Sequence, residues 1–315
     1  MKILILDGYT LFQSDLSRDA FSSYAEVIYR DRTSREEIKD LPFDVDVLVT
    51  NKCLIRSEEL SHFSKVKLIL VAATGYNCVD IQACAARDIQ VSNVPNYGTF
   101  SVAQHALSLL LHYSNQVGLH ARSVAKGDWS RNADWCYTMS PIQEWHGKTL
   151  GIIGMGNIGN CFAGMGESLG MQVIYTHTKD LKIPNRKFVS LAELAKNSDV
   201  ISLHCPLNQS TENLINRDFL ALMKTSAVLI NTSRGGLIDN LALANALESD
   251  VIAAALLDVL DVEPPMDSHV LPQTKNAFIT PHIAWISLEA RKRILASMLE
   301  TLDMFIQGKS QNRVN

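Results

Sequence analysis

The sequence has no dominant charge and no long apolar run. Its 29 basic and 33 acidic residues, among 315 in all, give a formal net charge of -4. That balance gives no electrostatic reason to expect a nucleic acid or an anionic membrane surface as a partner. The longest nearly uncharged stretch, residues 101–119, contains Gln104, His105, His112 and Asn115, so it predicts a buried helix and not a membrane span.

Cysteine is sparse as well, and its spacing is not that of a metal site. None of the six cysteines forms a C-x-x-C pair, and most have apolar neighbours. This usage indicates small buried thiols in a reducing compartment, so we expect a cytoplasmic protein without a disulfide scaffold. The apolar run at residues 3–6 is too short for a signal peptide. A chain of this length buries enough surface to fold without a structural metal, and none is expected.

Two series of short apolar runs alternate with helical patterns. The first series predicts strands at residues 2–7, 26–29, 45–50, 68–73 and 90–94. The second predicts strands at residues 149–154, 172–176, 200–204, 227–231, 252–259 and 277–280. The runs are rich in Ile, Leu and Val with little alternation, which indicates parallel strands covered on both faces. The sequence therefore predicts an α/β protein with doubly wound parallel sheets.

A different pattern separates the two series. Residues 101–126 predict one long helix that ends at Gly127. Residues 127–147 then lose all periodicity and contain three of the four tryptophans, so we interpret them as an ordered excursion at an interface or over a cleft. A last amphipathic helix is expected over residues 287–307.

A glycine-rich turn opens the second series. Gly154, Gly156 and Gly159 form a G-x-G-x-x-G run directly after a predicted strand, and Asn157 and Ile158 begin the following helix. The three glycines serve a tight turn, close approach of a pyrophosphate and packing of the helix on the strand. The N-terminus of the helix faces the phosphates. An ordinary strand-to-helix turn is the alternative, but the context favours dinucleotide binding.

The next strand lacks the acid that usually binds an adenosine ribose. His177 stands where that acid is expected, and Thr178 and Lys179 follow it. These three side chains suit a 2'-phosphate, which indicates NADP. The alternative is that Lys179 is a solvated turn residue and that NAD binds without the acid. The sequence leaves NAD or NADP open.

Three ionisable residues follow predicted strands of the second series. Arg234, Glu263 and His282 each come at or just after a strand, where open α/β sheets bind their ligands. An arginine fork suits a substrate carboxylate, and a histidine is the natural proton donor to a carbonyl oxygen near neutral pH. A carboxylate beside that histidine stabilises the imidazolium. Each residue alone has a structural explanation, but together they suit hydride exchange with a 2-oxo acid.

These motifs resemble those of the D-isomer-specific 2-hydroxyacid dehydrogenases, and most of all the bacterial glycerate dehydrogenase/hydroxypyruvate reductase branch. The likeness covers nearly the whole chain. The run from Asp258 to Pro264 resembles the family's D-V-F-x-x-E-P motif, and the run from Thr280 to Trp285 resembles its histidine segment with the Trp of the glycerate branch. Three positions depart from the family pattern, namely Leu260 for an aromatic residue, Gln104 for a common Glu, and His177.

The resemblance implies roles for residues at matching positions. Arg234, Glu263 and His282 would be catalytic. The cofactor would contact Gly154, Gly156, Asn157, Ile158, Gly159, His177, Thr178, Lys179, His204, Pro206, Thr211, Thr232 and Asp258, the last at the nicotinamide carboxamide. The substrate would contact Asn51, Thr74, Gly75, Arg234, His282 and Trp285.

The resemblance also implies an architecture. A Rossmann cofactor domain at residues 100–284 would be inserted into a flavodoxin-like substrate domain made of residues 1–99 and 285–315. The substrate would bind in the cleft between the domains. Family members are usually dimers through the cofactor domain, so we expect a homodimer with residues 127–147 at its interface.

Three functions fit these observations. The first is NAD(P)-dependent exchange between a small D-2-hydroxy acid and its 2-oxo acid, with hydroxypyruvate or glyoxylate as the expected substrate. The second is a non-catalytic dinucleotide-sensing protein on the same scaffold, against which the intact Arg234, Glu263 and His282 weigh. The third is a dehydrogenase for a bulkier or phosphorylated acid.

Overall fold

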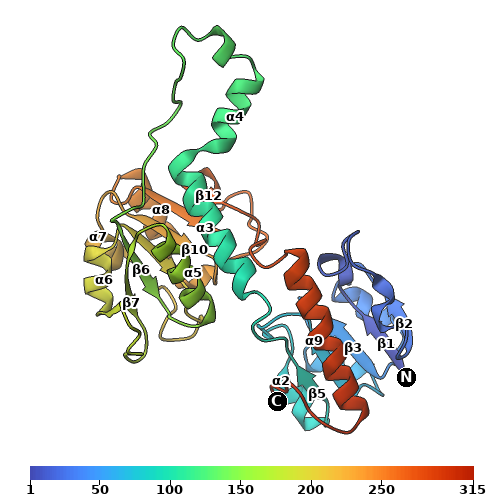
Figure 1. Ribbon diagram of the computed structural model, residues 1–315. Coiled ribbons are helices and arrows are strands. Elements are labelled where there is room, and N and C mark those ends of the chain that lie inside the picture. The colour runs from blue at the N-terminus through green and yellow to red at the C-terminus, as the bar shows by residue number, and fades with distance from the viewer. The chain divides into compact units, whose positions relative to one another are not determined.

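The computed structural model describes residues 1–315, and the chain divides into two compact units. Unit 1 comprises Met1–Gly98 and Trp285–Asn315, and unit 2 comprises Thr99–Ala284. Figure 1 shows a sheet with flanking helices in each unit. None of the helices combines the length and the apolar content that a membrane crossing requires.

Unit 1 contains a parallel sheet of five strands in the order β2-β1-β3-β4-β5. The strands are β1 (Lys2–Ile5), β2 (Glu26–Tyr29), β3 (Val47–Thr50), β4 (Leu68–Val71) and β5 (Gln90–Ser92). The helices are α1 (Ser57–His62), α2 (Ile81–Ala86) and α9 (Leu288–Ile306), with 3-10 turns at Gly8–Thr10, Arg18–Phe21 and Glu36–Asp40. This order is that of flavodoxin-like sheets, as the resemblance implied.

Both faces of the unit 1 sheet are buried. Alternate residues of β1 point to opposite faces, so that Leu4 packs with Leu60 and Phe63 while Ile5 packs with Phe21 and with Met298 of α9. Two-sided burial is the physical reason why the strands are apolar throughout and show no polar alternation.

Unit 2 contains a parallel sheet of seven strands in the order β12-β11-β10-β9-β6-β7-β8. The strands are β6 (Thr149–Ile153), β7 (Gln172–Thr176), β8 (Lys187–Phe188), β9 (Val200–Leu203), β10 (Val228–Asn231), β11 (Ala254–Leu257) and β12 (Ala277–Ile279). The helices are α3 (Thr99–Asn115), α4 (Val117–Ala125), α5 (Asn157–Ser168), α6 (Leu191–Asn197), α7 (Arg217–Leu222) and α8 (Asn240–Glu248). Short 3-10 turns lie at Trp129–Arg131, Gly235–Leu237 and Leu271–Gln273.

The chain reverses its direction of winding next to β6. From β6 it adds β7 and β8 on one side, and it then crosses back to add β9 and the later strands on the other. Side chains of α3 and α5 cover one face of the sheet, and those of α6, α7 and α8 cover the other. The carboxyl ends of β6 and β9 therefore form a topological switch point, where ligands of open α/β sheets bind. The predicted doubly wound fold is confirmed.

The single helix predicted over residues 101–126 is wrong. Gln116 has a φ of 46°, in the left-handed region, and divides the segment into α3 and α4. No proline or glycine occupies that position, so the sequence carries no signal for the break. Beyond the break, α4 and the segment that follows it extend away from the sheet of unit 2 (Figure 1). The two-residue strand β8 was not predicted either, because so short a run leaves no periodicity to detect.

Two glycines of α5 provide a matched test of how this helix packs. A Cβ at Gly159 would lie 2.3 Å from the carbonyl oxygen of Gly154, whereas one at Gly164 would meet only an Arg186 side-chain nitrogen at 3.9 Å. We expect Gly164→Ala to raise the free energy of unfolding by about 0.5–1 kcal/mol through helix propensity, and Gly159→Ala to lower it. Urea denaturation of both variants measures the difference. A stable Gly159→Ala variant would contradict the packing described here.

Candidate active site

The glycine turn lies between β6 and α5, at the switch point of the unit 2 sheet. Gly154 has a φ of 94°, and a Cβ there would lie 2.6 Å from the backbone nitrogen of Cys205. Only glycine therefore fits between the turn and the loop after β9. Gly156 differs, because a Cβ on it would meet no atom within 4 Å.

These features fit a dinucleotide. Gly156 is the N-cap of α5 and offers no side chain to the N–H groups of the first turn. The open space beside Gly156 allows a pyrophosphate to approach the backbone, and the positive end of the helix dipole favours its charge. Asn157 and Ile158 occupy the first turn of α5, as predicted.

The loop after β9 contributes buried polar atoms to the same edge of the sheet. His204 is partly buried, with Nε2 2.9 Å from the hydroxyl of Ser202 and a buried Nδ1 that has no hydrogen-bond partner. The hydroxyl of Thr232, after β10, is also buried without a partner. Thr211 donates a 2.7 Å hydrogen bond to the carbonyl of Pro206 and so closes this loop. Such orphaned buried atoms are rare and fit a site that a ligand completes.

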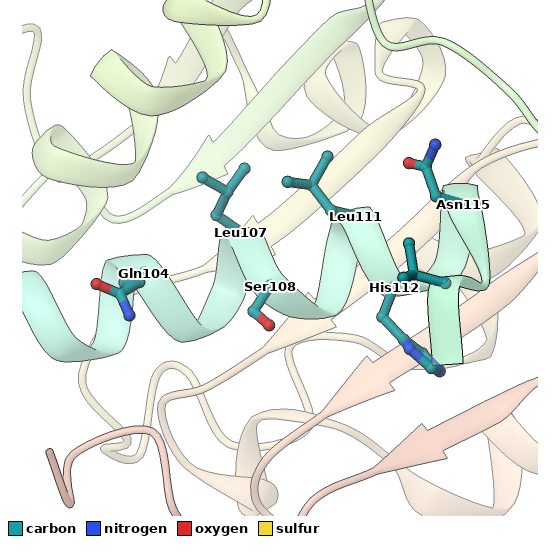
Figure 2. Close-up of a pocket in the computed structure, with 7 residues that line it drawn as sticks. Gln104, Leu107, Ser108, Leu111, His112 and Asn115 are labelled. Atoms are coloured by element: carbon teal, nitrogen blue, oxygen red, sulfur yellow. The ribbon is translucent and has the colours of Figure 1, made fainter. Parts of the chain in front are cut away.

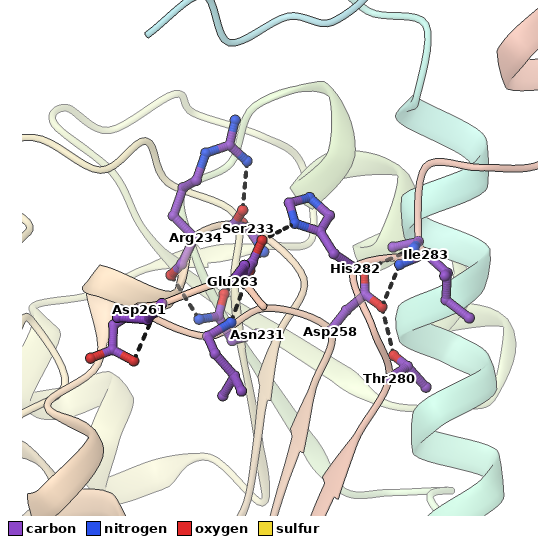
Figure 3. A network of polar contacts seen from close by, with 12 residues as sticks. Asn231, Ser233, Arg234, Asp258, Asp261, Glu263, Thr280, His282 and Ile283 are labelled. Carbon is purple, nitrogen blue, oxygen red and sulfur yellow. Dashed lines mark hydrogen bonds and ion pairs between the residues drawn. The ribbon is translucent and has the colours of Figure 1, made fainter. Parts of the chain in front are cut away.

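The three predicted catalytic residues lie on neighbouring strand ends. Arg234 follows β10, Glu263 follows β11 and His282 follows β12, and these strands are adjacent in the sheet. Figure 3 shows the three side chains gathered at this edge. The structure therefore brings the trio together within unit 2.

Glu263 holds the imidazole ring of His282. The Nδ1 atom of His282 lies 2.5 Å from Oε2 of Glu263, whose Oε1 accepts the N–H of Leu260 at 2.9 Å. A hydrogen on Nδ1 satisfies this contact, so Nε2 is the atom that can exchange a proton with a ligand. The side chain of His282 is 28% exposed, which keeps that exchange accessible.

Arg234 is exposed, and hydrogen bonds to neighbouring residues fix its backbone. Its Nη1 donates to the carbonyl of Ser233 at 2.7 Å, and its own carbonyl accepts from the Asn231 side chain at 2.9 Å. A Cβ on the next residue, Gly235, would lie 1.9 Å from the backbone carbon of Leu260. The loops that carry Arg234 and Glu263 are thus in backbone contact.

Asp258 fixes the loop that carries His282. Its buried carboxylate accepts the hydroxyl of Thr280 at 2.6 Å and the N–H groups of Ile283 and Ala284 at 2.9 and 2.8 Å. Its carbonyl accepts the N–H of His282, whose φ of 54° is uncommon for a residue other than glycine. The nicotinamide contact suggested for Asp258 stays a prediction.

The electrostatics of Asp258 follow from these contacts. Burial alone would raise the pKa of the Asp258 carboxyl, but hydrogen bonds from His105, Thr280 and the two backbone N–H groups lower it below its ordinary value. The Nε2 atom of His105, on α3, lies 2.9 Å from the Thr280 hydroxyl and 3.4 Å from the Asp258 carboxylate. Sequence reasoning gave no role to His105 or Thr280, because only the fold brings α3 to this strand end.

Unit 1 contains the remaining predicted substrate residues. The Asn51 side chain donates to the carbonyl of Ala72 at 2.8 Å, and the hydroxyl of Thr74 donates to the carbonyl of Val94 at 2.8 Å. The backbone N–H groups of Thr74 and Gly75 donate to no group of the chain. Trp285 packs edge-on against Tyr97, with ring centroids 6.2 Å apart.

Asp7 was not predicted, yet it orders the loop around Asn51. Its carboxylate accepts the N–H groups of Asn51, Lys52 and Cys53 at 2.7, 2.6 and 2.8 Å. The signal that was available is its position directly beyond the first strand, where polar residues of parallel sheets gather.

Comparison with known proteins agrees with this geometry. Residues 107–284 match the family model of the D-isomer specific 2-hydroxyacid dehydrogenase NAD binding domain. The chain is 41% identical to a hydroxypyruvate reductase of Blautia hydrogenotrophica, with 100% of both chains covered. The chain belongs to the D-isomer specific 2-hydroxyacid dehydrogenases. It is therefore an oxidoreductase that acts on CH–OH groups with NAD or NADP.

Two further relatives of this dehydrogenase match over nearly the whole chain. A glycerate dehydrogenase of Methylorubrum extorquens is 36% identical, with 99% of this chain and 98% of that protein covered. The solved structure of an NADPH-dependent glyoxylate/hydroxypyruvate reductase from Sinorhizobium meliloti matches with a TM-score of 0.83 at 25% identity, covering 99% of this chain and 97% of that one.

The desolvated ring of His204 in this dehydrogenase predicts a loss of stability in acid. Desolvation lowers the pKa of His204 from 6.5 to about 3. Below pH 6.5, His204 is therefore protonated in the unfolded chain but stays neutral in the folded chain. The free energy of unfolding carries no penalty from His204 above pH 6.5, and it falls progressively as the pH is lowered from there toward 3. At about 1.4 kcal/mol per pH unit, His204 costs about 2 kcal/mol at pH 5.

Urea denaturation at pH 7 and pH 5 checks this expectation. We expect His204→Gln to lose less stability between the two pH values than the natural sequence, because other titrating groups contribute equally to both. If both proteins lost the same free energy of unfolding between pH 7 and pH 5, His204 would have to be protonated in the folded state at pH 5.

Proposed function

We propose that the protein reduces hydroxypyruvate or glyoxylate to the corresponding 2-hydroxy acid with a reduced nicotinamide dinucleotide, or catalyses the reverse. The contact between Glu263 and His282, beside Arg234 and on the same sheet edge as the glycine turn, carries this proposal. Relatives named hydroxypyruvate reductase, glycerate dehydrogenase and glyoxylate reductase support a small 2-oxo acid as substrate.

Arg234, His282 and Glu263 have separate roles in the proposed reaction. Arg234 binds the substrate carboxylate through its guanidinium fork. His282 donates a proton from Nε2 to the carbonyl oxygen during reduction, and Glu263 stabilises the imidazolium before transfer. A nicotinamide cofactor, when bound at the glycine turn, would supply the hydride that the carbonyl carbon accepts. In the reverse direction, neutral His282 accepts the hydroxyl proton.

We assign the cofactor role to unit 2 and the substrate role to unit 1. The match of residues 107–284 to the NAD binding domain supports the first assignment. The unpaired N–H groups of Thr74 and Gly75 support the second, because neighbouring backbone donors are suited to a carboxylate. Asn51 and Trp285 are proposed as further substrate contacts. Asp258 and Thr232 are proposed as cofactor contacts with Gly154, Gly156, Asn157, Ile158, Gly159, His204, Pro206 and Thr211.

An assay of the natural sequence with hydroxypyruvate and glyoxylate tests the activity, and His282→Ala tests the mechanism. We expect the variant to lose about 10²–10⁴-fold in kcat because it lacks the proton donor. His269→Gln is the matched control, since His269 also contacts a carboxylate, with Nε2 2.8 Å from Asp261. Absorbance of the reduced cofactor reports the rates.

Three results decide between the candidate functions. Retained activity in His282→Ala would refute the proton-donor role. Turnover only with bulky or phosphorylated 2-oxo acids would favour the alternative substrate class. Cofactor binding without turnover of any 2-oxo acid would refute the proposed reaction.

We also propose that the protein is a homodimer that joins through α3, α4 and the segment after α4. Leu107, Leu111 and Val117 line an open groove along α3, together with Gln104, Ser108, His112 and Asn115 (Figure 2). Large apolar side chains continue beyond it, at Val124, Trp129, Trp135, Met139 and Ile142, all of them exposed. Several exposed apolar side chains in one stretch of the chain support a protein interface, and a second copy is the occupant that we propose.

Polar contacts order the segment after α4 as far as Met139, whereas Trp145 near its end is buried in the core of unit 2. The Ser123 hydroxyl donates to Asp128 at 2.6 Å, the Trp129 indole donates to the carbonyl of Trp135 at 2.9 Å, and the His120 ring accepts the N–H of Met139 at 3.1 Å. Trp135 is 85% exposed in the single chain. A fixed segment with an exposed indole supports a docking role.

Sedimentation velocity of the full chain tests the dimer. We expect the natural sequence to sediment as a dimer and Val117→Asp to shift toward the monomer, because a carboxylate would be buried in the interface. Leu241→Asp is the control, since Leu241 is exposed to a similar degree on α8. A monomeric natural sequence, or a dimer that Val117→Asp leaves intact, would contradict the proposal.

We further propose a cytoplasmic location. All six cysteines are free thiols, which suits a reducing compartment.

A further inference from the structure

A chain of hydrogen bonds runs from helix α3 to the loop that carries His282. The Nε2 atom of His105, on α3, lies 2.9 Å from the hydroxyl of Thr280. That hydroxyl lies 2.6 Å from Oδ1 of Asp258, which also accepts the N–H of Ile283 at 2.9 Å (Figure 3). The carbonyl of Asp258 accepts the N–H of His282 at 2.9 Å. The proposed reaction assigns no role to His105, although its ring stands at the start of this chain.

The charge of Asp258 sets the direction of each hydrogen bond. Burial raises the pKa of its carboxyl, but hydrogen bonds from His105, Thr280 and the backbone lower it below the ordinary value, so the group is ionised near neutral pH. An ionised carboxylate only accepts hydrogen bonds, so the Thr280 hydroxyl donates its single hydrogen to Asp258. Toward His105 the Thr280 oxygen can then only accept, which requires a hydrogen on Nε2 of the ring.

The N–H donor of His105 keeps the Thr280 hydroxyl turned toward Asp258. Another acceptor, the carbonyl of Leu257, lies within reach of that hydroxyl at 3.4 Å. The Asp258 side chain is fully buried and that of His105 is 19% exposed, so a lost hydrogen bond here leaves a polar group unsatisfied in a low dielectric. Such a loss would loosen the loop of His282, whose left-handed backbone persists only because its surroundings determine it.

Helix α3 holds the His105 ring from a firmly packed element. Ala103 and Ala106, on either side of His105, are fully buried and belong to the same core as Ile230 of β10 and Leu256 of β11. A functional group is held most precisely when its supporting residues are fixed by packing on helices and strands. His105 therefore has a fixed support from which to orient the strand-end loop.

We propose that His105 is a positioning residue for the reaction, and that the N–H donor at its Nε2 atom holds Thr280 and Asp258 in the arrangement that places His282. His105 exchanges no proton with the substrate in this assignment, so position 105 needs a donor and not a titrating group. This inference rests on the proposed reaction of His282 and adds a residue to it.

Two substitutions of similar length separate the donor from the ring. His105→Gln keeps an N–H donor as many bonds from Cβ as Nε2 of histidine, whereas His105→Met has no donor, and glutamine and methionine have similar helix propensities. With hydroxypyruvate and saturating reduced cofactor, we expect His105→Met to lower kcat about tenfold or more, because a slightly misplaced catalytic group is costly. The KM for hydroxypyruvate should stay within about twofold, since Arg234 is untouched. His105→Gln is expected to retain most of the natural kcat.

His62→Met is the matched control. The Nε2 atom of His62, the last residue of α1, lies 2.8 Å from the carbonyl of Leu41 in unit 1. This variant also removes a ring hydrogen bond from a partly buried histidine of a helix, but far in sequence from every residue of the proposed reaction. We expect its kcat to equal that of the natural sequence. Urea denaturation of each variant shows that the proteins compared are folded.

A double-mutant cycle tests whether His105 acts through the Thr280 hydroxyl. Thr280→Val removes that hydroxyl and is expected to lower kcat by itself. In the Thr280→Val background, His105→Met should lower kcat by no more than about twofold further, because residues in one hydrogen-bond network do not act independently.

The outcomes distinguish this inference from the proposed reaction. An active natural sequence whose His105→Met variant keeps its kcat, or whose His105→Gln variant loses as much as His105→Met, would overturn the positioning role. Losses from His105→Met and Thr280→Val that multiply would overturn the route through Thr280. A natural sequence that turns over no 2-oxo acid would overturn the proposed reaction, and the positioning role with it. Urea denaturation of the same four proteins then still tests the hydrogen bond, which additive losses in the free energy of unfolding would contradict.

Discussion

The geometry of the proposed catalytic edge, formed by the loops that carry Arg234, Glu263 and His282, depends on one buried carboxylate. Asp258 directly follows β11 and accepts hydrogen bonds from the hydroxyl of Thr280 and from two backbone N–H groups of the loop after β12. Those bonds hold His282 in a left-handed conformation that a residue with a side chain adopts only when its surroundings determine it. His105, on α3, also contacts the Asp258 carboxylate. The position of the His282 ring therefore depends on α3 and on the ends of β11 and β12.

In unit 1, a carboxylate near a strand end also fixes a neighbouring loop. Asp7 lies two residues beyond β1 and accepts hydrogen bonds from three successive N–H groups of the loop that contains Asn51. In both units an acid at the carboxyl end of a parallel strand converts a neighbouring loop into a fixed surface. Preorganised groups of this kind do not have to be ordered again when a ligand binds.

The sequence was informative where local pattern and fold agree. Apolar strands without alternation predicted parallel sheets, and the positions of three glycines and three strand-end residues predicted that they meet at one edge of the unit 2 sheet, as they do. The break at Gln116 was missed because no glycine or proline occupies that position. The roles of His105, Thr280 and Asp7 were missed because each depends on contacts between segments distant in the sequence.

The close approach of Gly235 to Leu260 limits how this catalytic edge can change. The backbone of the arginine loop rests on the backbone of the glutamate loop, with no space for even a methyl group between them. Any side chain at position 235 would force the two loops apart. New substrate preferences in proteins built this way should therefore arise by exchange of side chains around a fixed frame, while Arg234, Glu263 and His282 keep their spacing.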